Sequence, residues 1–71
     1  MIFDYSKLNG KIIEKGFTQK GFAEALKMAP STLSLKLNNK FTFSQDEISE
    51  ALNILGIPKN DVGIYFFTLK V

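Results

Sequence analysis

The sequence predicts a small all-α domain of four to five helices that occupies residues 1–71 as a single unit. Three observations support this fold class. Apolar residues recur at helical spacing in four segments, residues that favour helix ends separate those segments, and no repeat or linker divides the chain. A chain of 71 residues can bury one small core, which leaves little room for a deep catalytic cavity.

The first helix is predicted to follow Asp4 or Ser6, either of which can cap its start. It should end near Gly16, since glycine readily takes the left-handed conformation found at helix C-termini. One apolar stripe along this helix is expected to face the core, formed by Leu8, Ile12 and Ile13.

The second and third helices are separated by a very short turn. Thr18 caps a helix over residues 19–27, and Pro30 suits the first turn of the next helix. That helix should end at Asn38 and Asn39, because Asn is one of the few residues besides Gly that tolerate the left-handed conformation. The residues expected in the core are Phe22, Ala23 and Leu26 from the first of these helices and Leu33 and Leu37 from the second.

The fourth helix has the strongest start in the chain. Ser44 and Glu47 have the spacing of a capping box, and Gly56 marks the C-terminal end. Its core-facing residues are predicted to be Ile48, Ala51, Leu52 and Leu55. A short helical turn is expected over 62–65, and the aromatic and β-branched segments 1–3 and 65–71 suggest either a short terminal β-ribbon or a dimer contact.

The composition excludes most catalytic chemistry. With neither Cys nor His, the chain has no disulfide, no thiolate metal site and no imidazole base, so we expect no enzyme activity, no metal and no cofactor. The acidic residues Asp46, Glu47 and Glu50 are the one cluster that could suggest catalysis, and a helix-capping role explains the first two. Without a long apolar run or a signal peptide, the chain is expected to be cytoplasmic, away from membranes.

Positive charge is concentrated in the first half of the chain. Residues 7–40 contain seven lysines against two acids, a net +5, whereas residues 41–71 contain two lysines against four acids, a net −2. A basic half is typical of proteins that bind polyanions, and it is equally typical of solvated helix surfaces.

Two helices joined by a tight turn, with the small Ala23 on the inner side of the first and Pro30 opening the second, are typical of a helix-turn-helix. The segment TQKGFAEALKMAPSTLSLKLNNK resembles the helix-turn-helix core of the Cro and repressor proteins of temperate phages, within the lambda-repressor-like xenobiotic-response-element family. The segment STLSLKLNNKFTFSQDEI is similar to a small Cro-like family from Gram-positive phages, and that resemblance extends over nearly the whole chain. Three residues depart from the family pattern, namely Lys27 where Gly is usual, Ala29 in place of a Ser or Thr cap, and Asn39 in place of Gly.

The resemblance implies that the start of the second helix and the first half of the third meet the major groove of DNA. Carried over by position, the contacting residues are Gln19, Pro30, Ser31, Thr32 and Leu35, and the lysines placed to neutralise phosphates are Lys20, Lys36 and Lys40. Each polar residue has the alternative role of a helix cap or a solvated side chain, and each lysine that of promoting solubility. Leu35, which faces away from the core side of its helix, could contact a thymine methyl group or a protein partner, or be an isolated exposed apolar residue.

The chain contains no Arg, the residue that most often reads guanine, so sequence discrimination should be modest or lean toward A·T-rich sites. Phe41 and Phe43 could stack on single-stranded bases, but core packing is the favoured role for both.

Two functions follow from these observations. The first is a phage-type transcriptional repressor that binds double-stranded operator DNA, as a homodimer because a monomer of this size presents few contacts. The alternative is a helix-turn-helix modulator or antirepressor that binds a partner repressor protein, since Arg is missing and Leu35 faces outward. The apolar docking surface expected for that alternative consists of Leu35 with Phe66, Phe67 and Leu69.

Overall fold

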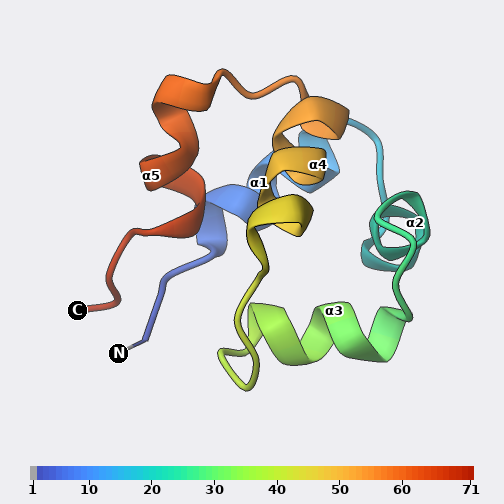
Figure 1. Cartoon of the computed structure of the whole chain (residues 1–71), viewed down its shortest axis with the longest axis horizontal. Helices are drawn as coiled ribbons and strands as arrows, with labels where there is room; N and C mark the ends of the chain where they lie inside the picture. Colours follow the sequence, from blue (N-terminus) through green and yellow to red (C-terminus); the bar gives the residue numbers. More distant parts are fainter. Residues whose placement is uncertain (1) are drawn as a thin grey trace.

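The fold is all-α, as the sequence predicts. The computed structural model describes residues 2–71 and shows a curved arrangement of helices with both chain ends on the same side (Figure 1). No helix in this part of the chain is long and apolar enough to cross a bilayer. The elements in chain order are α1 (Ser6–Glu14), α2 (Gln19–Ala25), α3 (Pro30–Leu37), α4 (Gln45–Leu55), the 3-10 turn η1 (Lys59–Asp61) and α5 (Val62–Phe66).

Side chains predicted to cap helix N-termini do so at α2 and α4. The Thr18 hydroxyl accepts a hydrogen bond from the Gly21 amide at the start of α2. At the start of α4, Ser44 and Glu47 form the expected reciprocal capping box. At α1, the cap position is Tyr5 and no side chain caps it, so the predicted cap by Asp4 or Ser6 is wrong; Ser6 is the first helical residue, and the Asp4 carboxylate, one residue before the cap position, accepts its amide at 2.9 Å.

The first four helices end in the same way. After each of them one residue takes a left-handed conformation, and the next amide reaches back to a carbonyl five residues earlier, as Lys40 N–H does to Leu35. Two of these residues are glycines, whereas Lys27 (φ 60°) and Asn39 (φ 63°) carry side chains. The left-handed turn at Lys27 ends α2 at Ala25, two residues earlier than predicted. Lys27 and Asn39, two of the three residues that depart from the family pattern, are thus the two with a strained backbone conformation.

The core is formed by residues from all five helices together with Tyr5 and Ile57. Most predicted core positions are confirmed. The prediction that Ile13 faces the core is wrong, because its side chain is 72% exposed. The inward side of α1 continues instead from Leu8 to Tyr5, which gives an i, i+3, i+7 stripe with Ile12. The fully buried large side chains are Phe22, Phe66, Leu8, Leu33 and Leu55.

An aromatic cluster closes the core between α1, α4 and α5. Phe43 packs edge-on against Tyr5 and Phe66, with ring centroids 5.5 and 5.3 Å apart. Phe41, expected to pack in the same way, is 59% exposed instead. The chain bends at Lys40 and Phe41 after the left-handed Asn39, so only Phe43 reaches the interior.

The expected terminal ribbon is reduced to one antiparallel bridge between Phe3 and Leu69. Two backbone hydrogen bonds flank it, from Asp4 N–H to the Thr68 carbonyl at 2.7 Å and from Lys70 N–H to the Ile2 carbonyl at 2.9 Å. Met1, included in the predicted ribbon, lies outside the described residues. A dimer contact through these segments stays a prediction.

Candidate functional site

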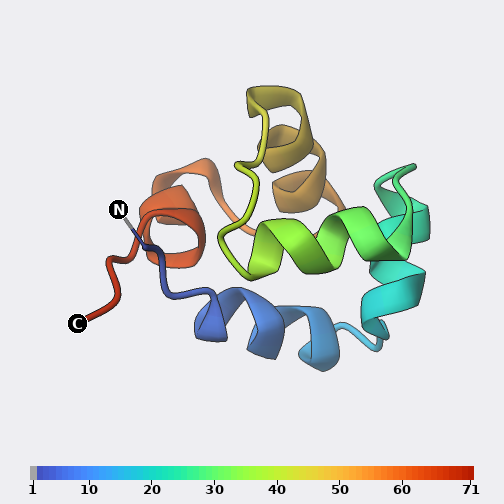
Figure 2. The same ribbon diagram turned by 90° about the horizontal axis from the view of Figure 1, so that it is seen from below.

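The helix-turn-helix consists of α2, α3 and the turn between them. The two helices pack against each other, and Phe22 and Ala23 of α2 and Leu33 of α3 are fully buried. Helix α3 lies along one edge of the molecule in Figure 1 and in front when viewed from that side in Figure 2. Its outer side is therefore free to meet a partner.

Most of the residues expected to contact DNA lie on the surface. Thr32 is half-buried, and Leu35 is 41% exposed, as expected for a residue on the outer side of α3. Contact with DNA itself stays a prediction for all of these residues. The exposed members of the set besides Leu35 are Gln19, Lys20, Pro30, Ser31 and Lys40.

Lys36 departs from its predicted role, because its side chain turns inward. The ammonium donates to the Glu47 carboxylate at 2.7 Å and to the Thr42 carbonyl at 3.0 Å, and the residue is only 9% exposed. It also lies 5.9 Å from the centroid of the Phe43 ring. The expectation of a mobile, phosphate-neutralising charge at Lys36 is corrected: the charge is used within the fold to join α3 to α4.

Glu47 links three features of this region. The same carboxylate oxygen accepts from Lys36 and, at 2.8 Å, from the Ser44 amide at the start of α4. Burial by itself raises the pKa of Glu47, but the hydrogen bonds from Lys36 and Ser44 outweigh burial and hold the pKa below its ordinary value. Glu47 is thus an anion bound to the fold at neutral pH.

The pairing of Lys36 leaves the outer side of α3 without a free charge. That helix has one ionisable residue, Lys36, and its solvent side presents Pro30, Ser31 and Leu35. The exposed lysines of the helix-turn-helix lie around α3, at the start of α2, in the turn and after the end of α3. They are Lys20, Lys27 and Lys40.

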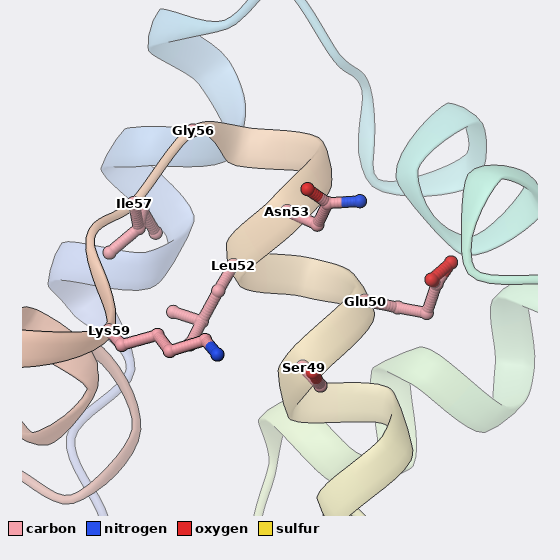
Figure 3. Close-up of a pocket in the computed structure, with 7 residues that line it drawn as sticks. All are labelled: Ser49, Glu50, Leu52, Asn53, Gly56, Ile57 and Lys59. Atoms are coloured by element: carbon pink, nitrogen blue, oxygen red, sulfur yellow. The ribbon is translucent and has the colours of Figure 1, made fainter.

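A second surface feature is a trough that runs along α4 beside η1 and α5. It consists of two adjoining hollows of about 310 Å³ each, which share the lining residues Ser49, Leu52 and Lys59. Figure 3 shows the polar hollow, where the Lys59 side chain extends toward α4 beside Leu52 while Glu50 points away toward α2. The apolar hollow is completed by Ile48, Val62, Phe67 and Gln45.

The trough was not foreseen as a site, because its walls come from three elements that no local pattern connects. One of its residues, Phe67, was expected on an apolar docking surface and is 52% exposed. Leu69, from the same prediction, is also exposed. The prediction that Phe66 belongs to this surface is wrong, because Phe66 is 1% exposed and packs against Tyr5 and Phe43. Among residues 2–71, no group of acidic side chains is arranged to hold a metal ion.

Comparisons with known proteins give one family match and a similar solved structure from a phage. A family model described as "Protein of unknown function (DUF739)" matches residues 1–69. The solution structure of the modulator of repression (MOR) of the temperate bacteriophage TP901-1 from Lactococcus lactis is similar, with a TM-score of 0.82 and 48% sequence identity over 100% of this chain and 96% of that chain. No curated protein sequence matches the chain significantly. These matches support the expected relation to phage regulators, without showing a Cro-like family, and they favour a modulator over a protein that binds operator DNA directly.

Proposed function

The chain belongs to the DUF739 family, and from this premise we propose that it is a modulator of repression, which binds a phage repressor protein rather than reading operator DNA itself. Its place of action is the cytoplasm of a bacterium that carries the phage, and its activity is binding without catalysis. The observation that carries this proposal, beside the likeness to the phage modulator, is the uncharged outer side of α3.

The charge of α3 matters because phosphate contacts supply much of the affinity of DNA-binding proteins. A helix that enters the major groove usually brings cations with it or beside it, and Arg is the commonest reader of guanine. Here the one lysine of α3 is paired with Glu47, and the chain has no Arg. The groove-reading helix of this fold therefore presents hydroxyl groups, a proline and a leucine, which supply no charge to pair with DNA phosphates.

Direct DNA contact remains a second candidate, favoured by the exposed Gln19, Lys20 and Lys40 around a helix-turn-helix with an accessible α3. Together with Lys27, the lysines Lys20 and Lys40 could neutralise about three phosphates. We therefore expect binding to DNA to be weak and strongly dependent on salt. Such contact would suit a complex in which the repressor supplies sequence recognition and this chain adds charge.

Isothermal titration calorimetry of the full chain against the purified repressor encoded by the same phage genome tests the proposal. We expect saturable binding with a negative heat-capacity change, since apolar surface is buried. Heat changes no larger than those of a buffer titration, at repressor concentrations that occupy its operator, would contradict the proposal.

A further inference from the structure

We infer that the trough along α4 receives an amphipathic helix of the repressor, with an acidic residue of that helix placed beside Lys59. This inference rests on the proposed function and names the surface that carries it. The trough differs from the outer side of α3 in being concave, and side chains seated in well-packed pockets contribute most of the energy of protein interfaces.

The floor of the trough alternates polar and apolar side chains along α4 and has the length of a helix segment. Gln45, Ile48, Ser49 and Leu52 follow i, i+3, i+4, i+7 spacing on one side of α4, a length of about 10 Å or two helical turns. Helices that bind grooves use anchors at the same spacing. An occupant of two to three turns could thus lie along α4.

The opposite wall keeps apolar surface in contact with water. Phe67 is 52% exposed and follows α5, and Val62 lies at the start of α5. An exposed aromatic ring that borders a hollow gains apolar contact when a partner covers it. By contrast, Leu35 on α3 is a single apolar residue among hydroxyl groups, which is common on protein surfaces.

Charge defines the chemistry of the occupant. Lys59 lines both hollows, and the two ion pairs of residues 2–71, Lys11 with Glu14 and Lys36 with Glu47, leave its ammonium without a carboxylate partner. Glu50, the acid that lines the polar hollow, points away toward α2 (Figure 3). A carboxylate on the occupant can therefore pair with Lys59, while Ser49 and Asn53 offer hydrogen bonds at the same end.

The composition of the trough also distinguishes the kind of partner. Ile48, Val62 and Phe67 offer no donors to phosphate oxygens, and the one cation of the trough, Lys59, could neutralise a single phosphate, so the trough suits a protein segment better than a nucleic acid strand. The other protein that could occupy the trough is a second copy of this chain. The experiment below distinguishes this occupant from the repressor.

The test uses two variants of the trough, each with a matched control on the helix-turn-helix. Ser49→Trp fills the trough, and Lys59→Glu reverses its charge; Ser31→Trp and Lys20→Glu make the same changes on α3 and α2. All four positions are exposed, so the fold should be kept, and circular dichroism melting checks this. Affinity for the purified repressor is measured by calorimetry, and the mass of each chain alone by analytical ultracentrifugation.

We expect Ser49→Trp and Lys59→Glu to weaken repressor binding at least tenfold, whereas Ser31→Trp and Lys20→Glu change it less than twofold. The reverse pattern, or equal effects at both surfaces, would overturn the trough as the docking site while leaving repressor binding intact. A wild-type dimer that Ser49→Trp converts to a monomer would show that a second copy occupies the trough, and would overturn the inference as well. Failure of the wild-type chain to bind the repressor would refute the proposed function and, with it, this inference.

Discussion

The Lys36 ammonium and the Glu47 carboxylate, 2.7 Å apart, connect the outer helix of the helix-turn-helix to the capping box of the next helix. The side chains are 11% and 27% exposed, so this pair is shielded more than an ordinary surface ion pair. One contact thereby serves two purposes: it fixes α3 against α4, and it removes from α3 the one charge that could have met DNA.

A double-mutant cycle measures the first of these purposes. We expect Lys36→Met and Glu47→Gln each to lower the free energy of unfolding, by about 1–3 kcal/mol, because each leaves a partly buried polar group without its partner. The double variant should lose less than the sum of the two single variants. Urea denaturation followed by circular dichroism gives these values; strict additivity would show that the two side chains do not interact in solution.

Stability should fall at acid pH, in part through Glu47. Its folded-state pKa lies below the ordinary value of 4.5, so its carboxylate contributes stability that is fully present above pH 4.5 and is lost as the pH falls through the folded pKa. The hydrogen bond from Lys11 also lowers the pKa of the exposed Glu14. Urea titrations between pH 7 and 3 should therefore give a shallower loss for Glu47→Gln than for wild type, and a smaller difference for Glu14→Gln. A Glu47→Gln profile parallel to wild type would contradict this assignment.

Lys27 offers a test of backbone strain. It has φ 60° in the turn between α2 and α3, where glycine avoids the steric cost of a side chain. We expect Lys27→Gly to raise the free energy of unfolding by about 1 kcal/mol. Lys27→Ala removes the same charge and keeps a β-carbon, so it should leave stability nearly unchanged. A gain from both variants would assign the effect to charge instead.

Asn39 combines a strained backbone with a specific contact. At φ 63°, its side-chain amide accepts from the Phe3 N–H at 2.9 Å and donates to the Phe3 carbonyl at 3.0 Å, as a neighbouring strand would. Asn39→Ala should cost about 2–3 kcal/mol, because both hydrogen bonds are lost and the strain remains. Asn39→Gly should cost about 1 kcal/mol less, since it relieves the strain.

Hydrogen exchange separates the contact from the strain. The Phe3 amide should exchange faster in both Asn39 variants, whereas the Lys70 amide, bonded to Ile2, reports the other side of the terminal bridge. An unchanged Phe3 exchange rate in Asn39→Ala would refute the contact.

Local chemistry made much of the fold predictable. The Ser44 and Glu47 box, the Thr18 cap and the glycines that end helices act within a few residues, so spacing alone identifies them. Two sides of α1 fit the apolar sequence pattern, one that includes Ile13 and one that includes Tyr5. The packing of Tyr5 against Phe43 and Phe66 determines which side faces the core, and that packing cannot be read from the spacing of residues along α1.

The candidate site was less accessible to sequence reasoning. The exposure of Leu35 follows from helical geometry and was predicted. The burial of Lys36 depends on Glu47, eleven residues away on another helix, and no local pattern distinguishes a paired lysine from a free one. Likewise, Lys59 and Phe67 line the same trough only because α4, η1 and α5 pack together in the fold.

The central claim is that this chain acts through a repressor and not by reading an operator alone. Fluorescence anisotropy of labelled operator duplex, titrated with the chain alone and with the chain added to preformed repressor–operator complex, tests it most directly. We predict that the chain alone binds the duplex weakly, without preference over scrambled DNA and with a steep loss on adding salt, while its addition to the complex changes the anisotropy saturably. Tight binding of the chain alone, selective for the operator sequence at physiological salt, would contradict the claim.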